Sequence, residues 1–187
     1  MKRLNSYMFE DVYKGLQIDL DELGCIMLNV EPVRGINIDK DWLYYTKDTK
    51  KFWIDGYVFD KVAHLTLLYG LLDSGHNWEK HVETVLKEWK MDTVEVESIG
   101  YFDSPYKEEE YYCIVAHIKV TDELMEGHQR LEFLPHINTF NGYKPHVTLA
   151  YVKKDEQIRD SVIAMFNNMI GYKLPVKSLN LGDKPSK

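Results

Sequence analysis

The chain has 187 residues, of which 44% are hydrophobic and 13% aromatic, so it can form a packed core and is not an intrinsically disordered chain. The formal net charge is −7, and no segment gathers lysine and arginine into the basic stripe expected of a protein that binds duplex nucleic acid. No apolar run reaches membrane-spanning length, and the first residues lack a signal-peptide core. We therefore expect a cytoplasmic location and no membrane partner.

The first half of the chain combines strand and helix periodicities. Residues 8–22 have the spacing of a short amphipathic helix, and the strongly apolar residues 25–31 predict a central strand. Residues 32–60 are irregular, polar and rich in aromatic side chains. This segment is long for a structureless loop in a compact domain, so we expect it to be a functional loop or lid. A strand is predicted at 62–70 and a helix at 77–90.

The second half of the chain alternates strands with helices. A strand hairpin joined by an acidic turn is followed by a helix that Thr121 can cap, and a later helix begins near Asp155. The predicted elements are a hairpin at 93–102 and 111–120, a helix at 121–134, a strand at 144–152, a helix at 155–170 and a strand at 174–181. This order predicts an α+β fold built from a duplicated unit with a pseudo-two-fold axis.

Two segments of the chain repeat one seven-residue pattern. The segment AHLTLLY contains His64 and Thr66, and the segment PHVTLAY contains His146 and Thr148. Each copy lies in a predicted strand and precedes a helix. A single histidine in an apolar strand is more often structural, but two copies that agree at matched positions indicate a shared function.

Strand geometry places the histidine and threonine of each copy on one face. Residues i and i+2 of a strand point to the same side, so His64 shares a face with Thr66, and His146 with Thr148. The same alternation sends Tyr69 away from the histidines and predicts that it is a core residue, as it does for the tyrosine that ends the second copy. Two such strands side by side would place two imidazoles and two hydroxyls around one cleft.

These groups are suited to acid–base chemistry on a phosphate. One imidazole can take a proton from an attacking oxygen while the other gives one to a leaving oxygen. Threonine hydroxyls can donate hydrogen bonds to the non-bridging phosphate oxygens as negative charge builds there. No spacing of histidines and cysteines indicates a metal site, and this chemistry needs neither a metal nor a cofactor. The two cysteines, Cys25 and Cys113, lie in apolar runs and are expected to be buried free thiols.

Four further side chains are candidates for substrate binding, each with a structural alternative. Alternation places Lys144 on the face of His146, where it could hold a phosphate or be a solvated strand-end lysine. His117 could line the cleft or be a partly exposed histidine. Tyr101 could stack on a base or pack in the core. Trp53, in the aromatic loop, could cap the cleft or belong to a local core under that loop.

With the motifs His64-Leu65-Thr66 and His146-Val147-Thr148, the sequence resembles the 2H phosphoesterase superfamily over roughly residues 24–182. This resemblance implies a bilobal α+β fold, with two pseudo-symmetric antiparallel sheets forming a central cleft and helices outside. It implies one domain over residues 1–187. Because chain ends are often poorly ordered, we expect the tail at about 182–187 to be frayed. The resemblance also implies metal-independent phosphodiesterase activity with the two histidines and two threonines as catalytic residues, and no cofactor.

A narrower resemblance concerns the substrate. The stretches DKDWLYY, HLTLLYGLLDS and GYKPHVTLAYV are similar to the phage anti-CBASS members of this superfamily. That resemblance implies hydrolysis of the 3′-5′ bonds of cyclic di- and trinucleotide signals made by bacterial defence, in the host cytoplasm. Two alternatives stay open: an RNA enzyme acting on 2′,3′-cyclic phosphate or 2′-5′ linked ends, and a protein that sequesters nucleotides without turnover.

Overall fold

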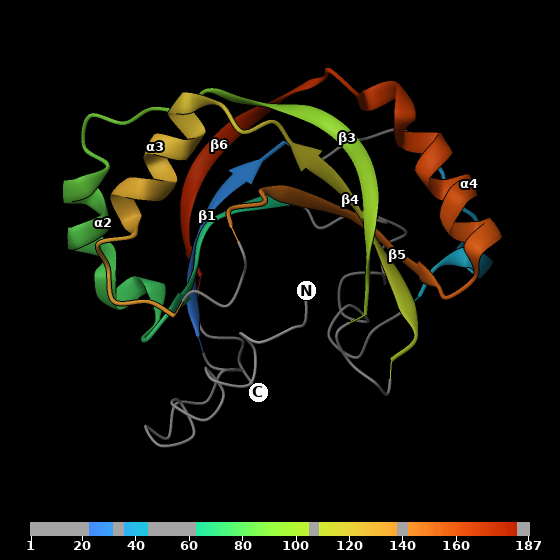
Figure 1. Ribbon diagram of the computed structural model, residues 1–187, viewed down its shortest axis with the longest axis horizontal. Helices are drawn as coiled ribbons and strands as arrows, with labels where there is room; N and C mark the ends of the chain where they lie inside the picture. Colours follow the sequence, from blue (N-terminus) through green and yellow to red (C-terminus); the bar gives the residue numbers. More distant parts are fainter. Residues whose placement is uncertain (1–22, 32–35, 45–62, 105–108, 138–141, 183–187) are drawn as a thin grey trace, which may run out of the picture.

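The computed structural model describes residues 23–31, 36–44, 63–104, 109–137 and 142–182 (Figure 1). These residues contain strands, α-helices and short 3-10 turns. The strands are β1 (Gly24–Val30), β2 (Ala63–Leu71), β3 (Thr93–Asp103), β4 (Tyr111–Ile118), β5 (His146–Lys153) and β6 (Lys173–Gly182). The helices are α2 (Glu79–Val85), α3 (Asp122–Leu131) and α4 (Glu156–Phe166), with 3-10 turns η2 (Lys40–Trp42), η4 (Gly75–Trp78) and η5 (Asn167–Met169).

The strands form an antiparallel sheet that closes on itself in the order β1-β2-β5-β4-β3-β6. It consists of two three-stranded halves, β6-β1-β2 and β5-β4-β3, with β1 and β4 at their centres. The halves meet at two places: β2 pairs with β5 at Leu65 and Val147, and β3 pairs with β6 around Val94 and Leu174. Figure 1 shows the strands curving in an arch with α2 and α3 outside one half and α4 outside the other.

The outer face of the sheet carries the core. Alternate side chains of each strand pack under the helices, and Leu124 of α3 and Val162 and Phe166 of α4 are fully buried against them. The opposite face, which we call the inner face, carries the polar side chains of the strands.

Among the described residues, no helix combines the length and the apolar character needed to span a membrane.

The predicted α+β fold is confirmed, and its two expected sheets are the halves of one closed sheet. Thr121 caps α3, since its hydroxyl accepts a hydrogen bond from the Leu124 amide, and the carboxylate of Asp155 caps α4. The helix predicted at 77–90 is shorter: a 3-10 turn precedes α2, which ends at Val85. The predicted helix at 8–22 and most of the loop at 32–60 lie outside the described residues.

A β-bulge follows the motif in each of the two HxT strands. In β2, Thr66 pairs with Met27 and Leu68 pairs with Ile26, so Leu67 is an extra residue. Both Leu67 and Leu68 are buried, and the alternation of faces is reversed after the bulge.

The equivalent bulge in β5 lies at Leu149. Thr148 pairs with Val115 and Ala150 pairs with Ile114, and both Leu149 and Ala150 are buried. In each strand the extra residue comes three positions after the histidine, so the duplication extends to the backbone irregularity.

The same duplication organises the remaining strands. In each half the central strand precedes the HxT strand, and the HxT strand is followed by a helix: β1, β2, α2 and then β4, β5, α4. The strand that follows each helix joins the opposite half, because β3 pairs with β4 and β6 pairs with β1. The two halves therefore exchange their edge strands around the predicted pseudo-two-fold axis, which passes between β2 and β5.

Packing of Trp89, which follows α2, against α3 yields a stability prediction at Gly127. A Cβ added there would lie 2.4 Å from Cζ2 of Trp89, whose indole nitrogen is held by a 2.7 Å hydrogen bond to the Glu123 carbonyl. Gly127→Ala is therefore expected to lower the free energy of unfolding by about 1–2 kcal/mol, because overpacking outweighs the gain in helix propensity.

Urea unfolding of wild type, Gly127→Ala and Gln129→Ala would measure this effect. Gln129 is exposed on the same helix, so its substitution should leave stability within about 0.5 kcal/mol of wild type. A Gly127→Ala protein as stable as wild type would show that the indole moves freely and that the tight packing is unimportant.

Candidate active site

The two HxT motifs meet across the seam between the halves of the sheet. Leu65 pairs with Val147, and these are the middle residues of the two motifs. Both are buried on the outer face, whereas His64 is exposed and His146 is partly exposed. The predicted sharing of one face by histidine and threonine therefore holds in both strands.

The antiparallel register brings each histidine to the threonine of the other motif. Pairing of Leu65 with Val147 sets His64 across from Thr148 and Thr66 across from His146. Non-adjacent parts of the sequence thus place two imidazoles and two hydroxyls on neighbouring strands of the inner face.

The orientation of His146 is fixed by its own backbone segment. Its Nδ1 lies 3.0 Å from the carbonyl oxygen of Lys144. Because a carbonyl oxygen only accepts, Nδ1 carries the proton, and Nε2 is the nitrogen that can exchange a proton with a substrate. A local hydrogen bond of this kind selects one tautomer of a catalytic histidine.

His117 lies beside the second motif, as one sequence interpretation placed it. It pairs with His146 across β4 and β5, so both rings lie on the inner face. Its ring covers Gly100, since a Cβ there would lie 2.6 Å from Nε2 of His117. Burial lowers the pKa of His117, the nearby His146 and Lys144 lower it further, and Glu97 partly opposes them.

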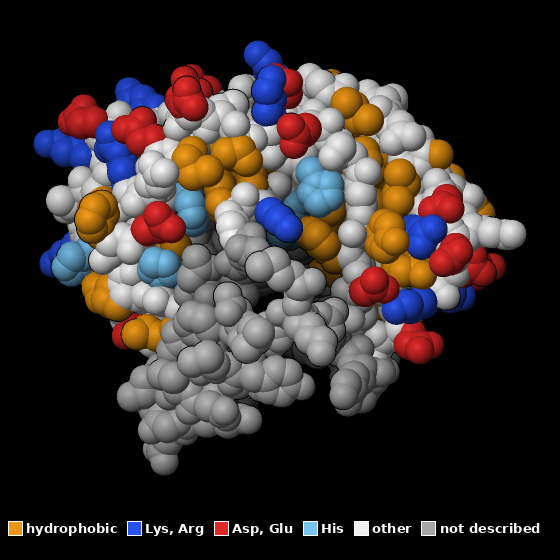
Figure 2. All heavy atoms as spheres, in the orientation of Figure 1, with side chains coloured by type: hydrophobic (Ala, Val, Ile, Leu, Met, Phe, Trp, Pro, Cys, Tyr) orange, Lys and Arg blue, Asp and Glu red, His pale blue; other side chains and the backbone are white. Residues whose placement is uncertain are grey.

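Phe102 is a site residue that sequence reasoning missed. Its ring centroid lies 4.9 Å from that of His146 and 5.7 Å from that of His117, both nearly edge-to-face. Phe102 is 37% exposed, so part of its ring is available to a ligand. Figure 2 shows histidine side chains next to a basic side chain on the face between the helix groups.

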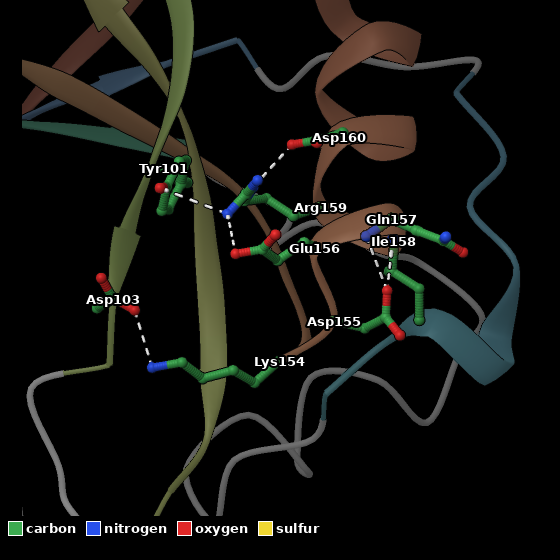
Figure 3. A network of polar contacts seen from close by, with 9 residues as sticks. All are labelled: Tyr101, Asp103, Lys154, Asp155, Glu156, Gln157, Ile158, Arg159 and Asp160. Atoms are coloured by element: carbon green, nitrogen blue, oxygen red, sulfur yellow. Dashed lines mark hydrogen bonds and ion pairs between the residues drawn. The ribbon is translucent and has the colours of Figure 1, made fainter.

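The structure does not bring Tyr101 to the histidines. Its ring packs edge-to-face on Tyr112, and the Arg159 guanidinium of α4 lies 4.6 Å from its centroid on the outer face (Figure 3). The reason is a bulge at Glu97, where the β3–β4 register shifts and reverses the faces of the strand. Phe102 therefore occupies the inner-face position.

The prediction that Tyr69 is a core residue is wrong for the same reason. The bulge at Leu67 turns Tyr69 to the side of His64, and it is 39% exposed. The tyrosine that ends the second copy, Tyr151, is partly buried and contacts the side chain of Cys113.

The two cysteines occupy equivalent positions in the two halves. Cys25 pairs with Tyr69, and Cys113 pairs with Tyr151. Both are free and partly buried thiols; burial raises the pKa of Cys25 and raises that of Cys113 to about 11, so neither is a thiolate at neutral pH.

The strand position paired with the motif histidine differs between the two halves: the half with His64 has an asparagine there, and the other half has a histidine. Asn29 pairs with His64 as His117 pairs with His146, so the two are equivalent. Asn29 donates to Ser178 at 2.9 Å and accepts from Asn180 at 3.3 Å. The shared Cys-Ile pair in the segments of β1 and β4 is the sequence signal that could have aligned these positions.

Two other sequence candidates have different outcomes. Lys144 is exposed directly before the second motif and acts on the pKa of His117, which places its charge at the site. Trp53 lies outside the described residues. Within the described part of the chain, no three histidine, cysteine or carboxylate side chains are grouped so that they could hold a metal ion.

The comparison with protein families decides the class. The model of the 2′-5′ RNA ligase superfamily matches residues 40–184, which include both motifs and most of the chain. The chain belongs to the 2′-5′ RNA ligase superfamily. These enzymes are 2H phosphoesterases, so the resemblance seen in the motifs is confirmed at that level, and the chain is a phosphodiesterase-type enzyme of this class.

Solved structures with a similar fold include Usb1 of Kluyveromyces marxianus. Its structure with uridine monophosphate has 10% identity and a TM-score of 0.49, covering 88% of this chain and 96% of that chain. Another structure of that Usb1 has 8% identity and a TM-score of 0.44, covering 87% and 95%. No curated protein sequence matches this chain. Because the identities and TM-scores are this low, neither Usb1 structure indicates what this chain binds.

Proposed function

We propose that the chain is a metal-independent phosphodiesterase that hydrolyses the 3′-5′ bonds of cyclic di- and trinucleotide second messengers. The observation that carries the chemistry is the pairing of Leu65 with Val147, which sets the two HxT motifs against each other on the inner face. Two proton-transfer groups on opposite sides of one phosphate satisfy the needs of general acid–base catalysis.

The reaction has two steps with the same residues. A ribose 2′-hydroxyl attacks the adjacent phosphorus and gives its proton to one imidazole, while the other imidazole protonates the departing 5′-oxygen. Water then attacks the resulting 2′,3′-cyclic phosphate with the two imidazoles in reversed roles. The hydroxyls of Thr66 and Thr148 donate hydrogen bonds to the non-bridging oxygens, whose charge rises in each transition state.

Charge and aromatic content favour a small cyclic substrate over a nucleic acid polymer. The net charge of −7 opposes a long polyanion, whereas a short ligand needs only local donors. Lys144 and His117 flank the second motif, where they are placed to hold a phosphate, and Phe102 is placed to stack on a base. The resemblance of both motif segments to anti-CBASS enzymes supports a role in removing a bacterial defence signal.

Phe102→Ala is expected to raise the KM for a cyclic dinucleotide about tenfold, because base–aromatic stacking contributes about 1–3 kcal/mol. Phe102→Tyr should keep the wild-type KM. Tyr101→Ala is the matched control: Tyr101 is next to Phe102 in the sequence but faces Arg159 of α4, so its loss should reduce stability and leave KM unchanged. If Tyr101→Ala raised KM and Phe102→Ala did not, Tyr101 rather than Phe102 would face the substrate.

An RNA substrate is the second candidate, and the name of the superfamily favours it. Enzymes that act on 2′-5′ linked or 2′,3′-cyclic phosphate ends need the same pair of imidazoles. Sequestration of nucleotides without turnover is the third reading, and the presence of both complete motifs speaks against it.

A substrate panel in EDTA separates these functions. The purified chain would be incubated with cyclic di- and trinucleotides, a 2′-5′ oligoadenylate and an RNA ending in 2′,3′-cyclic phosphate, and products identified by mass. Cleavage of the cyclic nucleotides alone is the expected result. Cleavage confined to the RNA or 2′-5′ substrates would reassign the substrate, and binding without any product would indicate sequestration.

A further inference from the structure

The seam that joins the catalytic strands has little sheet pairing of its own. β2 and β5 are paired at Leu65 and Val147, whereas β1 pairs with β2 along the whole length of β1. Catalysis nevertheless requires the two motifs to keep a fixed relative position, since displacements of about 1 Å can cost about 10²-fold in rate. Other contacts must therefore hold the motifs together.

Two side chains bond the backbone of the first motif where the bulge interrupts the sheet. The Tyr143 hydroxyl donates to the carbonyl oxygen of Thr66 at 3.1 Å. Nδ1 of His128 lies 2.7 Å from the carbonyl oxygen of Leu67 and carries the proton, because a carbonyl only accepts. Two successive carbonyls, one in the motif and one in the bulge, are thus bound from outside the strand.

The two donors also support each other. Their rings stack with centroids 4.0 Å apart and planes 6° from parallel. His128 belongs to α3, and its Nε2 lies 3.5 Å from the carboxylate of Glu132, the C-cap residue of that helix. Burial raises the pKa of Tyr143, so its hydroxyl keeps its proton at neutral pH and can act as a donor.

Their positions in the chain link the two motifs. Tyr143 stands three residues before His146, in the segment that enters the second motif, yet it bonds the backbone of the first motif. We infer that Tyr143 and His128 form a positioning pair that holds the first HxT motif in register with the second across the β2–β5 seam. Tyr143 acts through Thr66, and His128 acts through Leu67 and the ring of Tyr143.

Tyr143→Phe tests the pair because it removes the hydroxyl and keeps the ring that stacks on His128. On whichever panel nucleotide the wild type cleaves, we expect kcat to fall at least tenfold while KM stays within about twofold. His128→Ala should have the same signature. Tyr172→Phe is the control, since Tyr172 is 61% exposed, and it should change neither constant. An unchanged kcat in Tyr143→Phe would overturn the inference.

Hydrogen exchange provides a readout that does not depend on the substrate. In full-length protein, amide exchange at residues 64–67 and 146–149 is expected to be about tenfold faster in Tyr143→Phe than in wild type or Tyr172→Phe. Unchanged exchange at both segments would overturn the positioning role. If no panel nucleotide is cleaved, the proposed function fails, but faster exchange at both motifs would still support the pair.

Discussion

His146→Ala and His64→Ala are each expected to lower kcat about 10³-fold, within the range that a positioned acid or base contributes. His146 donates from Nδ1 to the Lys144 carbonyl, so its substitution removes the Nε2 that we propose exchanges the proton. His64 is exposed on the neighbouring strand, and its loss removes the second group. Nucleotide binding should persist in both variants, because the backbone and the remaining inner-face side chains are unchanged.

Single-turnover rates and equilibrium binding would be measured for both variants and for the double variant. Residues that act as a unit are not additive, so the double variant should be little slower than either single one. His81→Ala, an exposed histidine on α2, serves as the control and should retain wild-type turnover. Turnover within tenfold of wild type in either catalytic variant would contradict the two-histidine mechanism.

Features that depend on neighbouring residues in the sequence were predictable. The alternation of apolar and polar residues placed His64 and Thr66 on one face, and the oxygen-bearing side chains of Thr121 and Asp155 marked the starts of α3 and α4. The repeat of the motif indicates a duplicated fold without any information on strand pairing. These predictions agree with the structure because each depends on residues that are close together in the sequence.

Predictions failed where a one-residue bulge reverses the faces of a strand. Leu67 is the extra residue in β2 and brings Tyr69, predicted to be a core residue, to the inner face. A bulge at Glu97 in β3 likewise decides between the two alternatives left open for Tyr101 and puts Phe102 on the inner face. A bulge is defined by pairing with the next strand, so its position depends on residues far away in the sequence. Counting alternate residues through the first motif therefore predicts the right period and the wrong face for Tyr69.

The partners of the proposed catalytic residues also depend on register between distant strands. Asn29 and His117 become equivalent only when β1 pairs with β2 and β4 with β5. This equivalence gives the two halves different chemistry: an amide held by Ser178 stands beside His64, and a titratable ring stands beside His146. The candidate site is symmetric in the residues that we propose to be catalytic and asymmetric in their neighbours, and this asymmetry could orient a substrate.

Thr66→Val and Thr148→Val are each expected to lower kcat about 10²-fold with little change in KM. Valine has nearly the shape of threonine, so the substitution removes the hydroxyl and keeps the packing of the strand. A hydroxyl that donates to a phosphate oxygen is most valuable when charge develops there in the transition state, which is why kcat and not KM should respond. Thr→Ser at either position keeps the donor and should restore most of the activity.

Cys113→Ala separates the role of the hydroxyl from that of its neighbour. Sγ of Cys113 lies 3.8 Å from Oγ1 of Thr148, and the raised pKa keeps the thiol neutral. The thiol can orient the Thr148 hydroxyl but adds no charge, so Cys113→Ala should lower kcat no more than about threefold. A loss as large as that of Thr148→Val would show that the thiol is required as much as the hydroxyl, and would contradict a merely orienting role for Cys113. Equal losses in Thr66→Val and Thr148→Val would show that both motifs contribute a donor, as their opposed register on the inner face implies.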